Sequence, residues 1–264
     1  MALESALKRD RVIVLFALTA LAAVAWIYML EEARGMEATG VCSCMGMAMS
    51  GPDAGRWPAS QILPLFLMWA EMMVAMMIPS AAPMLLTFAM INRKKREQHQ
   101  PFVSTGLFLL GYLVVWTVFS LAAAVAQWAL HGAALLSPGM KSTSHGFGGA
   151  LLIFVGIFQW TPYKRACLDH CRTPLQFLMS DWREGKAGAV IMGLKHGAYC
   201  TGCCWLVMCL LFVVGVMSIF WIAVVTIFVL VEKVARFGPR CAHVSGLLFV
   251  AWGLWVIAAH SPTH

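Results

Sequence analysis

Long apolar stretches alternate with short polar segments along the whole chain. A helix needs about 20 apolar residues to cross a hydrocarbon layer of roughly 30 Å, and most of these stretches approach or exceed that length. The pattern predicts an all-α fold, a polytopic transmembrane helical bundle of about seven helices. The apolar runs are 12–30, 62–91, 102–130, 147–160, 187–217, 218–235 and 243–259.

The first and fourth runs differ from an ordinary span. Residues 12–30 follow three basic residues, as a signal core would, but the stretch is longer than a usual signal core. We therefore expect a retained first helix. Residues 147–160 are short for a span, and Pro162 is expected to end that helix because proline cannot continue the hydrogen-bond ladder.

Basic residues are distributed unevenly among the polar segments. The N-terminus and the segments 92–100, 163–186 and 232–240 carry an excess of lysine and arginine, whereas 31–60, 131–146 and the C-terminus do not. Cytoplasmic loops are enriched in lysine and arginine, so the first group is predicted to lie inside. This places the N-terminus in the cytoplasm and the C-terminus in the periplasm.

Composition supports a single membrane domain. The chain is 61% hydrophobic and 12% charged, whereas a soluble domain carries about 25% charged residues. No polar block is long enough for a second domain, so 1–264 is predicted to be one integral membrane domain. Within it, 31–60 is an extracytoplasmic Cys/Met-rich loop and 161–187 a cytoplasmic Cys/His loop. The net charge of +7 lies in loops that set orientation, so the lipid bilayer, and not nucleic acid, is the expected partner.

The fifth run carries a ladder of soft ligands. Helical spacing places their side chains on one face. The ladder consists of His196, Cys200, Cys203, Cys204 and Met208. Imidazole, thiolate and thioether suit Cu(I), or zinc where thiolates dominate. Close helix packing is the alternative, and Gly197 and Gly202 would serve it too. Four cysteines within ten residues favour a ligand or redox role.

The second run carries a methionine block that begins with an acid. Its candidate residues are Glu71, Met72, Met73, Met76 and Met77. The methionines form i,i+4 pairs, and a carboxylate within a span is costly. A methionine stripe alone is usually packing, but beside a thiol ladder the thioethers are plausible Cu(I) ligands.

Two polar segments contain further candidate ligands. Cys167, His170 and Cys171 have a spacing that fits one metal if a further ligand joins, or they include a reduced pair of cytosolic thiols. Cys42 and Cys44, predicted outside, either belong to a low-affinity capture site or form an oxidised pair. Met45, Met47 and Met49 lie beside them.

The chain resembles a bacterial family of predicted metal-binding integral membrane proteins. The similarity rests on 69–80 (WAEMMVAMMIPS), 167–172 (CLDHCR) and 193–205 (GLKHGAYCTGCCW), with Glu232-Lys233 downstream, and extends from about Pro64 to Ala258. It implies a metal-binding helical protein of the bacterial inner membrane, but no substrate or reaction. The segment 42–49 has no counterpart in the family pattern.

Our leading hypothesis is a copper-binding protein, more readily a carrier than an enzyme. Cu(I) would bind between the second and fifth helices and be transported or handed to a metallochaperone or a membrane metalloenzyme. Zinc fits the cysteines and histidine, but the methionines favour copper. Two alternatives are an accessory subunit of a metalloenzyme complex and a thiol oxidoreductase. In the second, Cys200 and Cys203 would form a redox pair that exchanges electrons with Cys167 and Cys171 or with a quinone.

Overall fold

The computed structural model describes residues 2–39, 41–42, 47–48, 58–99, 102–133, 145–216 and 218–259. In this part of the chain nearly all regular structure is helical, which confirms the all-α prediction. The helices are α1 (Ala2–Thr39), η1 (Ala59–Gln61, a 3-10 turn), α2 (Ile62–Glu97), α3 (Thr105–Gly132), α4 (His145–Phe158), α5 (Pro162–Arg172), α6 (Pro174–Ser180), α7 (Gly185–Cys209), α8 (Leu211–Val214), α9 (Ile219–Val234) and α10 (Gly238–Ala259). One short antiparallel pair joins β1 (Val41–Cys42) to β2 (Met47–Ala48).

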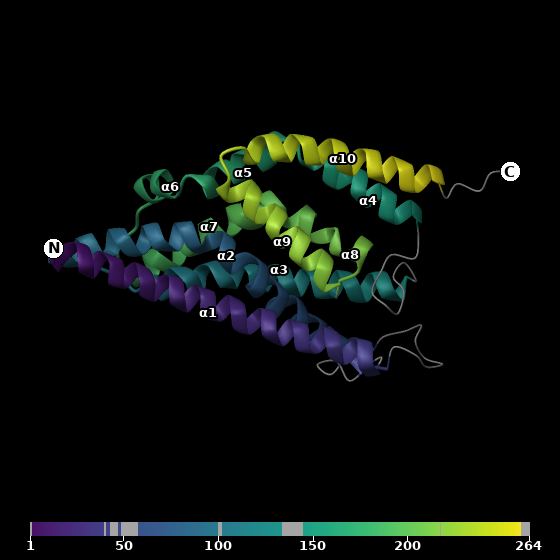
Figure 1. Ribbon diagram of the computed structural model, residues 1–264, viewed down its shortest axis with the longest axis horizontal. Coiled ribbons are helices and arrows are strands. Elements are labelled where there is room, and N and C mark those ends of the chain that lie inside the picture. The colour runs from purple at the N-terminus through teal and green to yellow at the C-terminus, as the bar shows by residue number, and fades with distance from the viewer. Residues whose placement is uncertain are drawn as a thin grey trace.

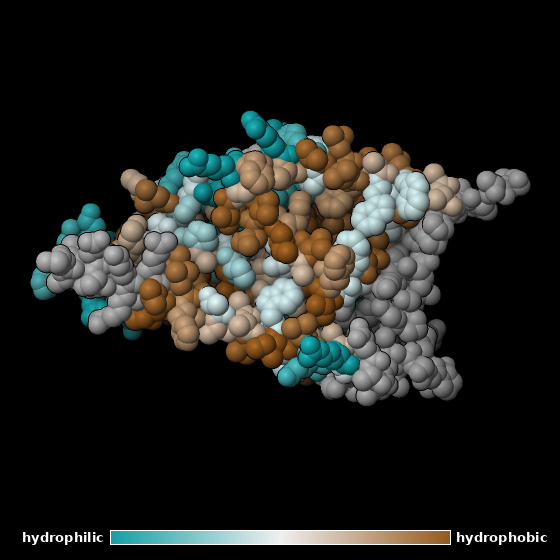
Figure 2. All heavy atoms as spheres, in the orientation of Figure 1, coloured by the Kyte–Doolittle hydropathy of each residue, from teal (hydrophilic) through white to brown (hydrophobic). Residues whose placement is uncertain are grey.

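Five helical segments of the described residues are long and apolar enough to cross a membrane. They are Val12–Gly35, Ala59–Glu97, Thr105–Gly132, Gly185–Val214 and Arg240–Ala259. Hydrophobic side chains cover the middle of the face in Figure 2, and hydrophilic ones gather toward its margins. The other two predicted spans correspond to α4 and α9, which have 14 and 16 residues. They are shorter than a 30 Å layer at about 1.5 Å per residue, so the count of seven stays a prediction.

The segment predicted to be a cytoplasmic loop, 161–187, is largely helical. Pro162 and Pro174 stand at the first turns of α5 and α6, where a missing N–H costs nothing. The Thr161 side chain caps α5 by accepting a hydrogen bond from the backbone nitrogen of Lys164 at 3.2 Å. Pro162 therefore starts a helix, and α4 has already ended at Phe158. On which side of the membrane these helices lie is still a prediction.

Helix α7 lies at the centre of the packing and contacts both α3 and α5. Its approach to α3 is very close, because a Cβ on Gly193 would lie 2.1 Å from the carbonyl oxygen of Phe108. Only glycine allows the two backbones to meet in this way. The close crossing brings the middle of α7 next to Tyr112 of α3.

The remaining helices surround this pair. Helices α1 and α2 pack side by side, and α4 and α10 form a second pair on the opposite side of the bundle (Figure 1). Helix α9 lies between the two groups and contacts α2, α5, α7 and α10. Its last turn, with Glu232 and Lys233, therefore reaches α7 near the cysteines. The N-terminal end of α1 and the C-terminal end of α10 lie at opposite ends of the molecule.

Candidate metal centre

All members of the α7 ladder are buried. The exposed fraction is 2% for His196, at most 1% for the three cysteines, and 0% for Met208. The thiols of Cys203 and Cys204 both donate to the carbonyl oxygen of Cys200, at 3.1 and 3.0 Å. The cysteines thus share one side of the helix, as their spacing predicts.

Helix α5 brings two further thiols to this side of α7. The Cys171 thiol lies close to those of Cys200 and Cys203, and this proximity, together with burial, holds its pKa well above the usual range. Burial and the nearby Cys203 raise the pKa of Cys167. Cys171, Cys200, Cys203 and Cys204 form what we call the thiol cluster. The cluster joins two helices that are distant in sequence.

Gly202 makes this approach of α5 possible. A Cβ at that position would lie 2.9 Å from the sulfur of Cys167 and 3.1 Å from the hydroxyl of Tyr163. Glycine therefore has a packing role in the same segment that carries the predicted ligands. The packing interpretation and the ligand interpretation of residues 196–209 are compatible.

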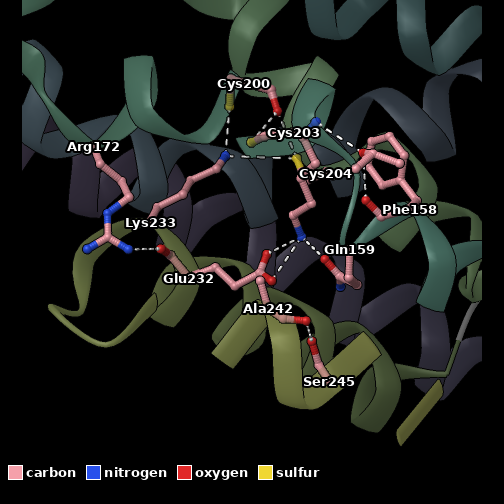
Figure 3. A network of polar contacts seen from close by, with 12 residues as sticks. Phe158, Gln159, Arg172, Cys200, Cys203, Cys204, Glu232, Lys233, Ala242 and Ser245 are labelled. Carbon is pink, nitrogen blue, oxygen red and sulfur yellow. Dashed lines mark hydrogen bonds and ion pairs between the residues drawn. The ribbon is translucent and has the colours of Figure 1, made fainter. Parts of the chain in front are cut away.

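A buried lysine reaches the thiol cluster from α9. The Nζ of Lys233 lies 2.8 Å from the sulfur of Cys200 and 3.9 Å from that of Cys204 (Figure 3). It also lies 3.3 Å from the hydroxyl of Ser80. The residue is only 6% exposed. A buried ammonium is costly unless an anion compensates it. Negative charge on the thiol cluster would supply that compensation.

The neighbouring Glu232 forms its ion pair with a different lysine, Lys164, and not with Lys233. Lys164 of α5 donates to both carboxylate oxygens of Glu232, at 2.9 and 2.8 Å, and also to Gln159 (Figure 3). Both members of this ion pair are 1% exposed. Arg172 adds hydrogen bonds to the carbonyl oxygens of Glu232 and Ala235. These contacts tie α5 to the end of α9 and so hold Cys171 in place.

Aromatic rings from α3 and α6 enclose His196. Its ring stacks on Tyr112 at 5.7 Å and lies 6.0 Å from Phe108 and 5.8 Å from Phe177. Its Nδ1 is buried and has no hydrogen-bond partner. An unpaired buried nitrogen is costly, and a bound metal ion would remove that cost. The histidine is therefore a fitting ligand, one helical turn before Cys200.

The C-terminal end of the methionine block lies near the thiol cluster. Met72, Met73, Met76 and Met77 are each 1% exposed. The hydroxyl of Tyr112 donates to the carbonyl oxygen of Met77 at 3.2 Å and lies 3.1 Å from the sulfur of Cys200. Tyr112 therefore connects the two predicted ligand groups. Sequence reasoning missed it because a single tyrosine in an apolar run carries no signal.

The other candidate residues lie elsewhere. His170 is exposed and stacks on Tyr199 at 4.3 Å, while the two cysteines of its helix face α7. Glu71 lies near Glu32 of α1. Cys42 and Met47 belong to the short strand pair, and Cys44, Met45 and Met49 lie outside the described residues.

No closed set of three His, Cys, Asp or Glu ligands is present in the described part of the chain. The donors do fit a soft ion by their chemistry, because thiols and an unpaired imidazole nitrogen surround Cys200.

Comparison with known proteins identifies the family. A family model described as "PpoB2: Copper chaperone" matches residues 66–256. The chain belongs to this family. No curated protein and no solved structure matches it. The PpoB2 match includes the methionine block, the thiol cluster and Lys233, but not α1 or the segment 42–49. A copper-related family agrees with the metal chemistry expected from the sequence.

Proposed function

We propose that this PpoB2 family member holds Cu(I) at the thiol cluster within the bacterial inner membrane and delivers it to a partner protein. Copper is then the cargo of the protein. The observation that carries the proposal is the buried ammonium of Lys233, 2.8 Å from Cys200 in a group of thiols from two helices. The thiols thus supply soft ligands directly beside the positive charge of Lys233.

Charge balance supports a monovalent ion. Cu(I) with two thiolates carries one negative charge, which Lys233 would neutralise in a medium where net charge is costly. Zinc with the same two thiolates would be neutral and would leave Lys233 uncompensated. Zinc with three thiolates and His196 would also carry one negative charge. The neighbouring thioethers and the copper chaperone family favour copper over this second arrangement.

Delivery requires a ligand that a partner can reach. Cys171 is half-buried, in contrast to the three fully buried cysteines of α7, and His170 beside it is exposed. In the proposal, Cu(I) moves from Cys200 and Cys203 toward Cys171, and a partner thiol takes it there by ligand exchange. The charge distribution predicts that α5 faces the cytoplasm, so a cytoplasmic chaperone or the inner side of a membrane enzyme is the proposed partner.

Metal content tests this function directly. The protein is purified in detergent under anaerobic conditions from cells grown with copper, and its metals are measured by mass spectrometry. Near-stoichiometric copper is expected in the wild type and in Cys209→Ser and Cys241→Ser, whose thiols lie outside the cluster. The copper held by the thiols should be lost in the Cys200→Ser/Cys203→Ser/Cys204→Ser variant, so its copper content should fall clearly below that of the controls. Equal copper in that variant and in the controls would contradict the proposal.

Thiol-disulfide exchange is a second candidate function, favoured by the proximity of the Cys171 thiol to those of Cys200 and Cys203. Cys200 and Cys203 share one helix, where residues three apart have Cβ atoms about 5–6 Å apart, beyond disulfide range. A bond from α5 to α7 is therefore the one expected. A metal-free protein that forms a mixed disulfide with a partner in a Cys171→Ser variant would support this function over copper delivery.

A further inference from the structure

A small cavity lies between α1 and α2, apart from the thiol cluster. Its volume is about 70 Å³, and its walls come from both helices. The lining residues are Tyr28, Met29, Glu32, Leu67, Met68, Glu71 and Met72. A single water needs about 10–15 Å³ of such space, so the cavity is large enough for an ion.

Three thioethers belong to this cavity. Met29, Met68 and Met72 are 3%, 5% and 1% exposed. Methionine is flexible and normally fills gaps in a core, yet here three methionines border an open space. Thioether sulfur is a neutral soft ligand that selects Cu(I) over hard cations. The lining is therefore selective for the cargo proposed above.

Two carboxylates face the same space. Glu32 is 9% exposed, and its charge acts on Glu71. Oxygen Oε1 of Glu71 is buried and has no hydrogen-bond partner. Two like charges in a membrane-spanning region are costly, and a cation between them would remove much of that cost. The carboxylates therefore add an attraction for positive charge that the thioethers lack.

We propose that Met29, Met68, Met72, Glu32 and Glu71 form a second Cu(I) site, which we call the acceptance site. Neutral thioethers hold Cu(I) less tightly than thiolates, so an ion would pass from this site to the thiol cluster down a gradient of affinity. This transfer rests on the proposed function, whereas binding at the acceptance site does not.

The position of the acceptance site fits a first stop for the ion. Met68 lies six residues into α2, roughly 9 Å from the start of that helix. From Met72 the helix rises roughly 7.5 Å to Met77, whose carbonyl oxygen binds Tyr112 beside Cys200. Buried thioethers of Met73 and Met76 lie along this interval. The two sites are therefore connected by soft donors.

The test uses the Cys200→Ser/Cys203→Ser/Cys204→Ser variant as the starting protein, labelled with selenomethionine. The full chain is loaded anaerobically with Cu(I), and selenium-edge X-ray absorption then detects copper bound to selenium. Cu(I) affinity is measured in parallel by competition with a chromophoric chelator. Met68→Leu/Met72→Leu removes two thioethers with little change in volume. Met84→Leu is the matched control, because Met84 is buried on the same helix and does not line the cavity.

We expect the starting variant to show copper–selenium scattering, Met84→Leu to keep it, and Met68→Leu/Met72→Leu to lose it. Glu71→Gln, which preserves shape, should weaken Cu(I) binding about tenfold or more, since one charge at close range is removed. The proposal is overturned if the starting variant shows no copper–selenium scattering. It is equally overturned if both methionine variants bind alike while Glu71→Gln has no effect.

The two proposals can fail separately. Unchanged copper in the triple serine variant would refute binding at the thiol cluster. Copper–selenium scattering in that variant would then still decide for or against the acceptance site. A loss of copper in the serine variant with no selenium signal would refute the acceptance site alone. If the double leucine variant does not fold, Glu71→Gln still decides the outcome.

Discussion

Removal of the buried charge at Lys233 provides the most direct test of how the site binds copper. The change Lys233→Met keeps the length of the side chain and replaces the ammonium with an apolar group. In the proposal this ammonium neutralises the extra negative charge of a two-thiolate Cu(I) complex. Its loss should weaken copper binding while leaving every sulfur ligand in place.

The size of the effect follows from the geometry. Two unit charges separated by 2.8 Å, the distance from Lys233 Nζ to Cys200 Sγ, attract by about 6 kcal/mol at an effective dielectric constant of about 20. The negative charge is spread over copper and two sulfurs, which lowers this attraction. We therefore expect Lys233→Met to lose about half of the 6 kcal/mol. A loss of about 3 kcal/mol raises the Kd for Cu(I) by about a hundredfold.

The assay is anaerobic competition for Cu(I) between the protein and a chromophoric chelator. Lys233→Arg keeps the charge and should remain within about tenfold of the wild type. Lys195→Met serves as the matched control, because Lys195 is on α7 but its side chain is 39% exposed and pairs with Asp181. Thermal unfolding in detergent is measured for each variant, since removing a buried charge can raise stability. Wild-type affinity in a folded Lys233→Met protein would refute the charge argument.

Three further predictions concern the support of the site. Gly202→Ala should destabilise the protein by about 1–3 kcal/mol in thermal unfolding, because its Cβ would press on α5, whereas Gly132→Ala, with open space around it, should not. Glu232→Gln should cost about 3–5 kcal/mol by leaving Lys164 without a counter-charge, and adding Lys164→Met should recover most of that loss; no recovery would contradict the pairing. Cys171→Ser should slow copper transfer to an acceptor chelator in stopped-flow measurements while bound copper stays near the wild-type amount, and an unchanged rate would exclude Cys171 as the point of exit.

Local pattern was sufficient for the larger part of the fold and for the ladder. Helical periodicity alone places His196, Cys200 and Met208 on one side of a helix, and the structure confirms that they are buried there. The same reasoning failed for α5 and α6. These helices have 11 and 7 residues, too short to span a membrane, so the sequence predicts a loop over 161–187 and a helix end at Pro162, whereas the structure has Pro162 at the start of a helix.

By itself the sequence determined the membrane-type composition, the helical class, the soft chemistry of the candidate ligands and the copper-related family. Only the tertiary structure decided which groups meet: Cys171 and Lys233 against Cys200, Tyr112 against Met77, and Met29 with Glu32 against the start of α2. The physical reason is that periodicity specifies the exposed and buried sides of one helix but not the neighbour that each side contacts. That choice depends on where backbones can approach, as at Gly193 and Gly202, and on where buried charges find partners.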